Sequence, residues 1–206
     1  MISAIILAAG ESKRMGLAPG GKQLLPLGDS TILEKTIDNV VASAVDETIV
    51  VLGYSAAEIR SKIDCRPVKI VLNSEYRNGM STSVIAGLKA VEAGTEAILL
   101  VLGDQPFIRS QVINRLISEY KSHDKGIVVP SYRGKRGHPV IISLSYEYLL
   151  LSIKGDVGAR EIIYHHPDDV LEVEMDSVEI TIDIDTPEEY RAAKGKEAKR
   201  ARYHNG

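Results

Sequence analysis

The chain has 206 residues, of which 44% are hydrophobic and 26% charged, an ordinary globular composition that excludes overall disorder. Its 25 Lys and Arg residues against 28 Asp and Glu residues give a net charge of −3, which argues against a general nucleic-acid-binding protein. The single cysteine, Cys65, excludes an internal disulfide and a cysteine-based metal cluster, and this usage fits a cytoplasmic protein. Because no apolar run approaches about 18 residues, we expect no membrane span.

Apolar runs of strand length alternate with helical patterns over the first 125 residues. The first run follows Met1 without a basic segment, so we interpret it as a buried strand rather than a signal peptide. Four runs are nearly continuous in Ile, Val and Leu, as is typical of parallel strands covered on both faces: 2–7, 47–52, 68–72 and 96–102. This rhythm predicts an α/β fold with an open, mostly parallel, Rossmann-like sheet and helices on both faces.

Capping residues and apolar periodicity predict the intervening helices. A capping box at Thr31 and Glu34 opens the first helix, and a second box at Ser55 and Glu58 opens the next. The first helix should bury Leu33, Ile37, Val40, Val41 and Ala44. A third helix is expected from about Ser83, with Val84, Leu88 and Val91 inward, and a fourth buries Val112, Leu116 and Ile117.

After about residue 126 the elements become shorter. Strands are expected at 127–129, 140–143, 171–174 and 180–182, and helices near Ser145 and Gly158. We expect this smaller C-terminal part to add mixed or antiparallel strands at the sheet edge. No repeat or linker divides the chain, so we interpret residues 1–206 as a single domain.

The first predicted strand ends in a glycine-containing loop, from Leu7, Ala8, Ala9 and Gly10 to Gly16. Ligands of open α/β folds bind beyond the carboxyl ends of the strands, where backbone N–H groups together with Lys13 and Arg14 would suit a polyphosphate. A basic surface turn is the simpler alternative. The Gly10–Gly16 spacing differs from Gly-x-Gly-x-x-Gly, which disfavours a dinucleotide-dependent dehydrogenase.

Lys22 closes a segment that partly matches a P-loop. Gly16 to Lys22 reads Gly-x4-Gly-Lys, but Gln23 follows where Ser or Thr is required. The segment does not directly follow a strand, and Pro26 argues against a helix beginning there. We therefore reject the P-loop and keep Lys22 as a phosphate-binding candidate, with a solvated lysine as the alternative.

Two acidic segments are candidates for a metal site. Asp104 follows the fourth strand, at the sheet edge where the glycine loop also lies, and Mg²⁺ is usually held by one or two carboxylates plus substrate phosphates. An ordinary turn aspartate is the alternative. A capping box explains Thr186, Pro187 and Glu189 but not Asp185, which precedes the helix. Asp104 and Asp185 together could hold a cation, with Asp183 as the alternative second ligand.

Polar residues flank two further predicted loops. Asn78, Ser81 and Ser83 lie where the third helix should begin, and could cap it or hold a ribose or base edge. Arg133, Lys135, Arg136 and His138 form a glycine-containing basic segment that suits an anionic acceptor or a solvated hairpin. His123, His165, His166 and His204 are expected at the surface or at helix ends, and the basic tail is expected to be a frayed helix end.

Taken together, these segments resemble the MobA-like NTP transferase family, and within it the molybdenum cofactor cytidylyltransferases. The resemblance covers residues 7–187 and rests on Leu7 to Gly10, Ser12 to Gly16, Lys22 with the apolar residues after it, Asn78 to Ser81, Gly103 to Pro106, Arg136 to Pro139, Gly155 to Arg160 and Asp183 to Pro187. One departure is the glycine-rich stretch 17–21, which is longer than this family's usual approach to the lysine.

The resemblance implies a nucleotide-diphospho-sugar transferase-like fold and Mg²⁺-dependent transfer of CMP from CTP to the phosphate of molybdopterin or molybdenum cofactor, with release of pyrophosphate. It implies a nucleotide-binding half over about 1–125, an acceptor-binding half over about 126–193 and a basic tail over 194–206. The implied catalytic residues are Arg14, Lys22 and Asp104. The implied nucleotide-binding residues are Leu7, Ala8, Ala9, Gly10, Asn78, Ser81 and Ser83. The implied acceptor-binding residues are Arg136, His138 and Arg160, and the implied Mg²⁺ ligands are Asp104 and Asp185.

The same resemblance narrows the nucleotide and leaves other functions open. Ala9 stands where guanine users carry glycine, and its Cβ leaves less room for a large base, which predicts CTP over GTP. A further expected partner is a molybdenum hydroxylase or its maturation factor, whereas nucleic acid and membrane are not expected. Alternatives are an enzyme of the same fold acting on a sugar or polyol phosphate, and a non-catalytic carrier of molybdenum cofactor.

Overall fold

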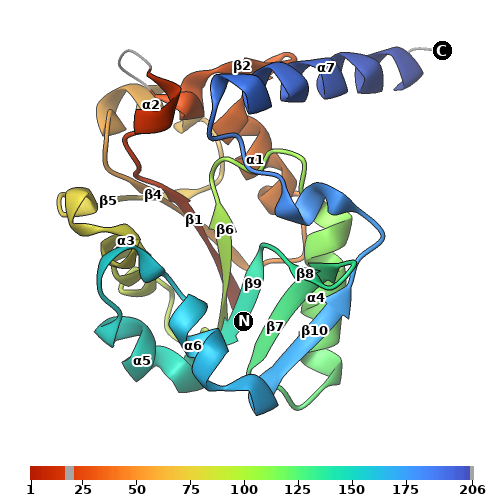
Figure 1. The fold of residues 1–206 in the computed structure, drawn as a ribbon. Helices are drawn as coiled ribbons and strands as arrows, with labels where there is room; N and C mark the ends of the chain where they lie inside the picture. Colours follow the sequence, from red (N-terminus) through yellow and green to blue (C-terminus); the bar gives the residue numbers. More distant parts are fainter. Residues whose placement is uncertain (17–20, 205–206) are drawn as a thin grey trace.

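The computed structural model, which describes residues 1–16 and 21–204, has one eight-stranded sheet as its centre (Figure 1). The strands run in the order β10-β7-β9-β6-β1-β4-β5, and β8 pairs with β7. Their bounds are β1 Ile2–Ala8, β4 Glu47–Leu52, β5 Lys69–Leu72, β6 Ala97–Leu102, β7 Ile127–Tyr132, β8 Lys135–Arg136, β9 Val140–Ser143 and β10 Val170–Glu174. The predicted α/β fold with a mostly parallel sheet is confirmed.

Central strand β1 shows why the apolar runs are continuous. It lies parallel to both β4 and β6, and its neighbouring residues Ile5 and Ile6 are fully buried on opposite faces of the sheet. Ile6 packs in a core with residues of α1 (Ile32–Val41), α2 (Ala56–Ile63) and α4 (Ser110–Ser122). Ile5 packs with residues of α3 (Met80–Leu88), α5 (Glu147–Ser152) and α6 (Arg160–His165) on the other face. Covering by helices on both faces removes the alternation that a half-exposed strand would show.

The C-terminal strands extend the sheet beyond β6 as a mixed edge, as expected, although the antiparallel strand β9 lies inside this edge and the parallel strand β10 is outermost. β9 pairs antiparallel with both β6 and β7, and the edge strand β10 is parallel to β7. A tight turn explains the position: Arg133 and Gly134 have φ of 50° and 75°, and they return the chain from β7 through β8 into β9. The prediction of a strand at 180–182 is wrong, because Val178–Thr181 forms a 3₁₀ turn, η7.

The first half of the chain contains the four predicted helices, but some of them begin or end at other residues than predicted. The Thr31–Glu34 capping box is present in α1, which ends at Val41, so Ala44 lies beyond the helix and is exposed. The second capping box is wrong: Ser55 has a left-handed φ of 51° and makes no side-chain cap bond. Helix α3 begins at Met80 rather than near Ser83 and ends at Leu88, before Val91. Helix α4 buries Leu116 and Ile117 as predicted, whereas Val112 is only half-buried.

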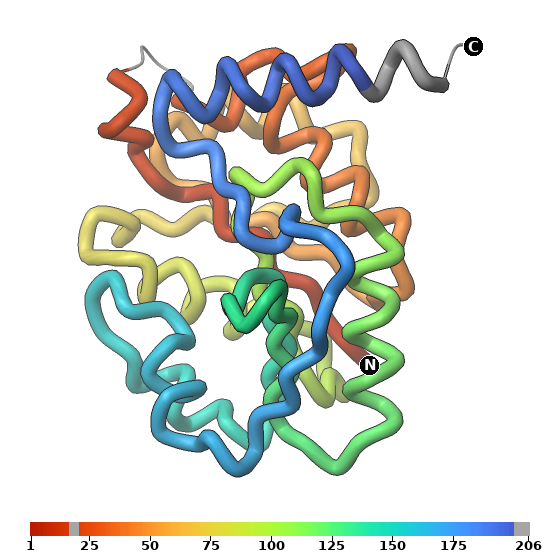
Figure 2. The backbone as a smooth tube through the Cα atoms, turned by 45° about the vertical axis from the view of Figure 1, so that its right-hand side comes forward, coloured from red at the N-terminus to blue at the C-terminus, as the bar shows by residue number. Residues whose placement is uncertain are grey.

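The C-terminal helix α7 (Pro187–His204) lies along the top of the molecule in both views (Figures 1 and 2). The predicted capping box opens it, because Glu189 N donates to Thr186 Oγ1 at 3.2 Å and Thr186 N donates to Glu189 Oε2 at 2.8 Å. The helix packs on the β2–β3 hairpin (Pro26–Leu27 and Ser30–Thr31), where the Tyr190 hydroxyl donates to the Pro26 carbonyl at 2.7 Å. Residues 194–204 therefore continue a helix rather than fray, and residues 205–206 lie outside the described part. None of the helices described is both long and apolar enough to cross a membrane.

Candidate active site

A cleft of about 1070 Å³ opens at the carboxyl ends of β1 and β6. Its walls come from segments far apart in the sequence, among them the glycine loop, the start of α3, the end of β6, the β8 hairpin, the start of α6 and residues 180–185. Lys22, Asp104, Asp183 and Asp185 lie on one side of it. The cleft is therefore the place where most of the residues expected from the sequence meet.

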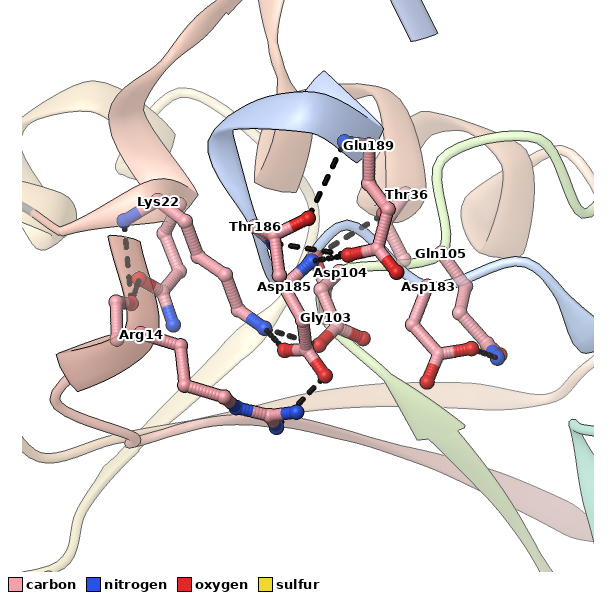
Figure 3. Close-up of polar contacts among 12 residues, drawn as sticks. Arg14, Lys22, Thr36, Gly103, Asp104, Gln105, Asp183, Asp185, Thr186 and Glu189 are labelled. Carbon is pink, nitrogen blue, oxygen red and sulfur yellow. Dashed lines mark hydrogen bonds and ion pairs between the residues drawn. The ribbon is translucent and has the colours of Figure 1, made fainter. Parts of the chain in front are cut away.

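Two carboxylates share the ammonium group of Lys22 (Figure 3). Lys22 Nζ pairs with Asp104 Oδ2 and, at 2.5 Å, with Asp185 Oδ1. Arg14 adds a second cation, 2.7 Å from Asp185 Oδ2. Since both carboxylate oxygens lie within hydrogen-bond reach of one nitrogen, they are no more than roughly 5 Å apart.

Backbone contacts at the end of β6 bring the two aspartates together. Ile184 N donates to the Asp104 carbonyl at 3.1 Å, which holds the 183–185 segment against the strand end. Gly103 N donates to the Leu7 carbonyl at 3.0 Å, and a Cβ on Gly103 would lie 3.0 Å from that same oxygen. The glycine thus allows the close approach of β6 to β1 that places Asp104 beside the glycine loop.

Lys22 is held at the start of the 3₁₀ turn η2 (Lys22–Leu24). Its backbone N–H donates to Ser12 Oγ at 3.1 Å, and its side chain is only 10% exposed. Burial alone would lower the pKa of Lys22, but the nearby Asp104 and Asp185 carboxylates outweigh it, so the pKa is raised. The lysine therefore stays charged at neutral pH.

The donor set at this end of the cleft suits a hard divalent cation. Asp104 Oδ1 is buried and has no hydrogen-bond partner, so one carboxylate oxygen remains free to bind a ligand. Within residues 1–16 and 21–204, no cluster of three or more His, Cys, Asp or Glu side chains is placed to hold a metal. A pair of carboxylates nevertheless fits Mg²⁺ or a similar ion whose other ligands are water and substrate phosphate.

Asp183 lies beside Gln105, a residue that was not among the candidate site residues. Gln105 Nε2 donates to Asp183 Oδ1 at 3.5 Å, and Gln105 is 2% exposed. Burial, with the neighbouring Asp104 charge, raises the pKa of Asp183. Asp185 rather than Asp183 forms the ion pair with Lys22, so the pair Asp104–Asp185 is the better candidate ligand set. The position of Gln105, directly after Asp104 at a strand end, was the available signal.

The residues expected to bind nucleotide divide into two groups. Leu7, Ala9, Gly10 and Ser83 line the cleft, whereas Ala8, Asn78 and Ser81 do not. Asn78 is exposed and its amide donates to Glu75 Oε2 at 2.6 Å.

Asn73 was missed, although it follows directly after strand β5. It is 6% exposed, and its amide donates to Thr82 Oγ1 at 2.8 Å and to Ser83 Oγ at 3.0 Å. Asn73 thereby positions the first turn of α3 next to the cleft.

The residues expected to bind the acceptor all line the cleft: Arg136, His138 and Arg160. Arg136 Nε donates to Glu172 Oε1 at 2.8 Å, so its charge is already paired in this state. His138 N donates to the Ile180 carbonyl at 2.9 Å, which anchors the hairpin to η7. Burial lowers the pKa of the His138 imidazole, Asp104 partly opposes this, and Arg160 lowers it further, so His138 is neutral at pH 7.

This fold, with paired carboxylates facing a glycine loop at the strand ends, is that of a nucleotidyltransferase. Residues 4–170 match the family described as the MobA-like NTP transferase domain, and the chain belongs to this family.

Several known proteins are similar over nearly their whole length. The molybdenum cofactor cytidylyltransferase of Escherichia coli (strain K12) is 30% identical over 194 residues, covering 94% of this chain and 95% of the relative. The nicotine blue oxidoreductase of Paenarthrobacter nicotinovorans is 29% identical over 199 residues, covering 91% of this chain and 94% of the relative. The crystal structure of Rv0371c from Mycobacterium tuberculosis H37Rv superposes with a TM-score of 0.85 at 29% identity, covering 94% and 97%. A structure of Rv0371c in complex with manganese gives a TM-score of 0.82 at 28% identity, with the same coverage.

Proposed function

We propose that this protein transfers CMP from CTP to the phosphate of molybdopterin or molybdenum cofactor and releases pyrophosphate. The observation that carries the proposal is the convergence of Asp104 and Asp185 on one ammonium group, beside the glycine loop at the edge of the cleft. The similarity to the E. coli cytidylyltransferase supports this choice of acceptor.

In the proposed reaction, an oxygen of the acceptor phosphate attacks the α-phosphorus of CTP. A new P–O bond forms as the bond from the α-phosphorus to the bridging oxygen breaks, and pyrophosphate leaves with that oxygen. No side chain becomes covalently attached, so the protein acts by positioning the two anions and stabilising charge.

The basic residues near the glycine loop would receive the triphosphate. The Gly10 loop offers backbone N–H groups, and Arg14 and Lys22 would turn from the carboxylates toward the phosphates. Asp104 and Asp185 would hold Mg²⁺, which supplies positive charge between the triphosphate and the acceptor phosphate. The structure of the relative Rv0371c in complex with manganese supports the use of a divalent cation.

The opposite wall would receive the acceptor. Arg160 is exposed in the cleft, and neutral His138 can donate or accept a hydrogen bond without adding charge. The charge of Arg136 is already paired with Glu172, so we assign it a weaker contribution than Arg160. Ala9 is 4% exposed and lines the cleft, and we propose that its Cβ favours cytosine over guanine.

The decisive experiment is turnover with CTP, Mg²⁺ and molybdenum cofactor, with the product identified by mass. The expected result is a cytidylylated cofactor and one pyrophosphate per product. Sugar and polyol phosphates are tested in parallel as acceptors, and NAD(P)H oxidation is a counter-screen suggested by the similarity to nicotine blue oxidoreductase. Cofactor binding without pyrophosphate release would instead indicate a carrier, and turnover with a sugar or polyol phosphate alone would reject the acceptor.

A further inference from the structure

The start of α3 and the loop before α6 touch at a pair of glycines on the wall of the cleft. The ideal Cβ of an alanine at Gly79 would lie 2.8 Å from Gly155 Cα and closer still to the Gly155 carbonyl group. These atoms belong to segments 76 residues apart, and both tube and ribbon views show the two segments side by side (Figures 1 and 2). Backbone therefore packs on backbone here, which only glycine permits.

Helix α3 receives its side-chain cap from this second segment. Its N-cap residue, Gly79, has a φ of 108° and offers no side chain to the first-turn N–H groups. Met80 N instead donates to Asp156 Oδ1 at 3.0 Å. A carboxylate at this position satisfies a free donor and faces the positive end of the helix dipole.

Both joined segments line the cleft. Gly79, Met80 and Ser83 stand on the α3 side, and the residues from Asp156 to Arg160 stand on the other. On the α3 side, Asn73 fixes Ser83, so the first turn of the helix is anchored from within. Arg160 follows only four residues after Asp156, at the first position of α6. Whatever fixes Asp156 thus also limits where Arg160 can lie.

We propose that Asp156 is a positioning residue that ties the 155–160 loop to the start of α3 and so sets the place of Arg160 relative to the nucleotide. The idea that Arg160 meets the acceptor rests on the proposed function, but the tie itself does not. Asp156 also lies in the field of Lys13 on the glycine loop, whose pKa is raised mainly by its hydrogen bond with Glu11 and in smaller measure by Asp156.

Amide hydrogen exchange of the ligand-free protein tests the tie directly. In Asp156→Ala, peptides covering 79–84 and 155–163 should both exchange about five-fold faster, the effect of losing an ordinary helix cap. Asp156→Asn should restore the wild-type rate in both, because its amide oxygen can still accept from Met80 N. Asp176→Ala removes another exposed carboxylate from a different loop and should change neither peptide. Unchanged exchange of 155–163 in Asp156→Ala, or equal acceleration in Asp156→Asn, would overturn the tie.

Kinetics with CTP and molybdenum cofactor test what the tie does. Asp156→Ala should raise the KM for the cofactor at least five-fold while the KM for CTP changes less than two-fold, and Asp156→Asn should restore it. An equal rise in the KM for both substrates, or a fall in kcat with both KM values unchanged, would overturn the positioning role. If the wild type does not turn over the cofactor, the proposed function fails while the exchange result still decides whether Asp156 ties the loop.

Discussion

Lys22 donates a 2.5 Å hydrogen bond to Asp185, a residue that is 163 positions away in the chain. The same ammonium also pairs with Asp104, so Lys22 supplies one positive charge between the two carboxylates proposed to hold a cation, and Arg14 adds a second beside Asp185. The side chains of Lys22, Asp104 and Asp185 are 10%, 17% and 18% exposed, respectively. In the absence of a bound cation, such a pair of carboxylates would repel each other, and the lysine offsets that repulsion.

Replacing Lys22 with methionine should therefore destabilise the ligand-free protein by about 2 kcal/mol, because the two mostly buried carboxylates lose the cation between them and only Asp185 keeps a cationic partner, Arg14. Urea unfolding at pH 7 measures this. Mg²⁺ or Mn²⁺ should stabilise Lys22→Met more than the wild type, since the cation takes the place of the ammonium. Lys62→Met, on an exposed position of α2, is the control and should be neutral. Equal stabilisation of the wild type and Lys22→Met by the cation would contradict the idea that the cation and the Lys22 ammonium occupy the same site.

The contribution of Lys22 to the free energy of unfolding should also decrease at alkaline pH. Because the folded pKa of Lys22 is raised above its ordinary value of 10.5, the stabilising pair is fully present below that value. It is lost as the pH rises through the folded pKa. The difference in unfolding free energy between wild type and Lys22→Met should accordingly stay constant from pH 7 to about 10 and shrink above that.

Asp104→Asn should lower kcat by about a thousand-fold while the protein stays folded, because the amide keeps the shape but supplies no charge to a cation. Titration with Mn²⁺ in the presence of CTP, followed by electron paramagnetic resonance, should show binding weakened at least ten-fold. Asp38→Asn, an exposed surface pair with Arg66, is the matched control. If Asp104→Asn binds Mn²⁺ as tightly as the wild type, the Asp104 carboxylate is not a ligand of the metal.

The strand pattern was predictable because it depends on burial alone. Residues 2–7 and 47–52 are nearly continuous apolar runs, and both form parallel strands covered on two faces. The proximity of Asp104 and the glycine loop followed from the rule that parallel strands share one carboxyl edge. The capping boxes at Thr31 and Thr186 were also readable, since each is a local pattern within four residues.

Long-range pairing explains what the sequence could not predict. The Ile180 region is apolar enough for a strand, but it forms a 3₁₀ turn whose carbonyl accepts from His138 N. Ser55 has the composition of a cap, yet its left-handed backbone gives it no side-chain cap bond. Asn73 and Asp156 act on α3 from residues 9 and 76 positions away, and no local pattern encodes either contact.

The His138 imidazole should titrate below its ordinary pKa of 6.5, because it is buried and faces Arg160. Arg160→Met should raise the His138 pKa toward 6.5, and Arg136→Met, on the same hairpin as His138, is the control that should leave it unchanged. The C2-proton shift measured by NMR reports both. With a lowered folded pKa, His138 contributes stability that is present above pH 6.5 and is lost as the pH falls below it. His138→Gln should flatten that part of the stability profile.

Ala9 should determine which base the cleft accepts. Its side chain is 4% exposed, lines the cleft and sits against Gly53, where an added Cβ would be 2.9 Å from the Ala9 Cβ, so the methyl group has little freedom to move aside. We expect kcat/KM for CTP to exceed that for GTP, and Ala9→Gly to reduce this preference about ten-fold, the usual effect of one methyl group in a tight pocket. Ala8→Gly is the matched control, because Ala8 is buried but does not line the cleft. A wild-type preference for GTP, or an equal change in Ala8→Gly, would show that the base is selected elsewhere.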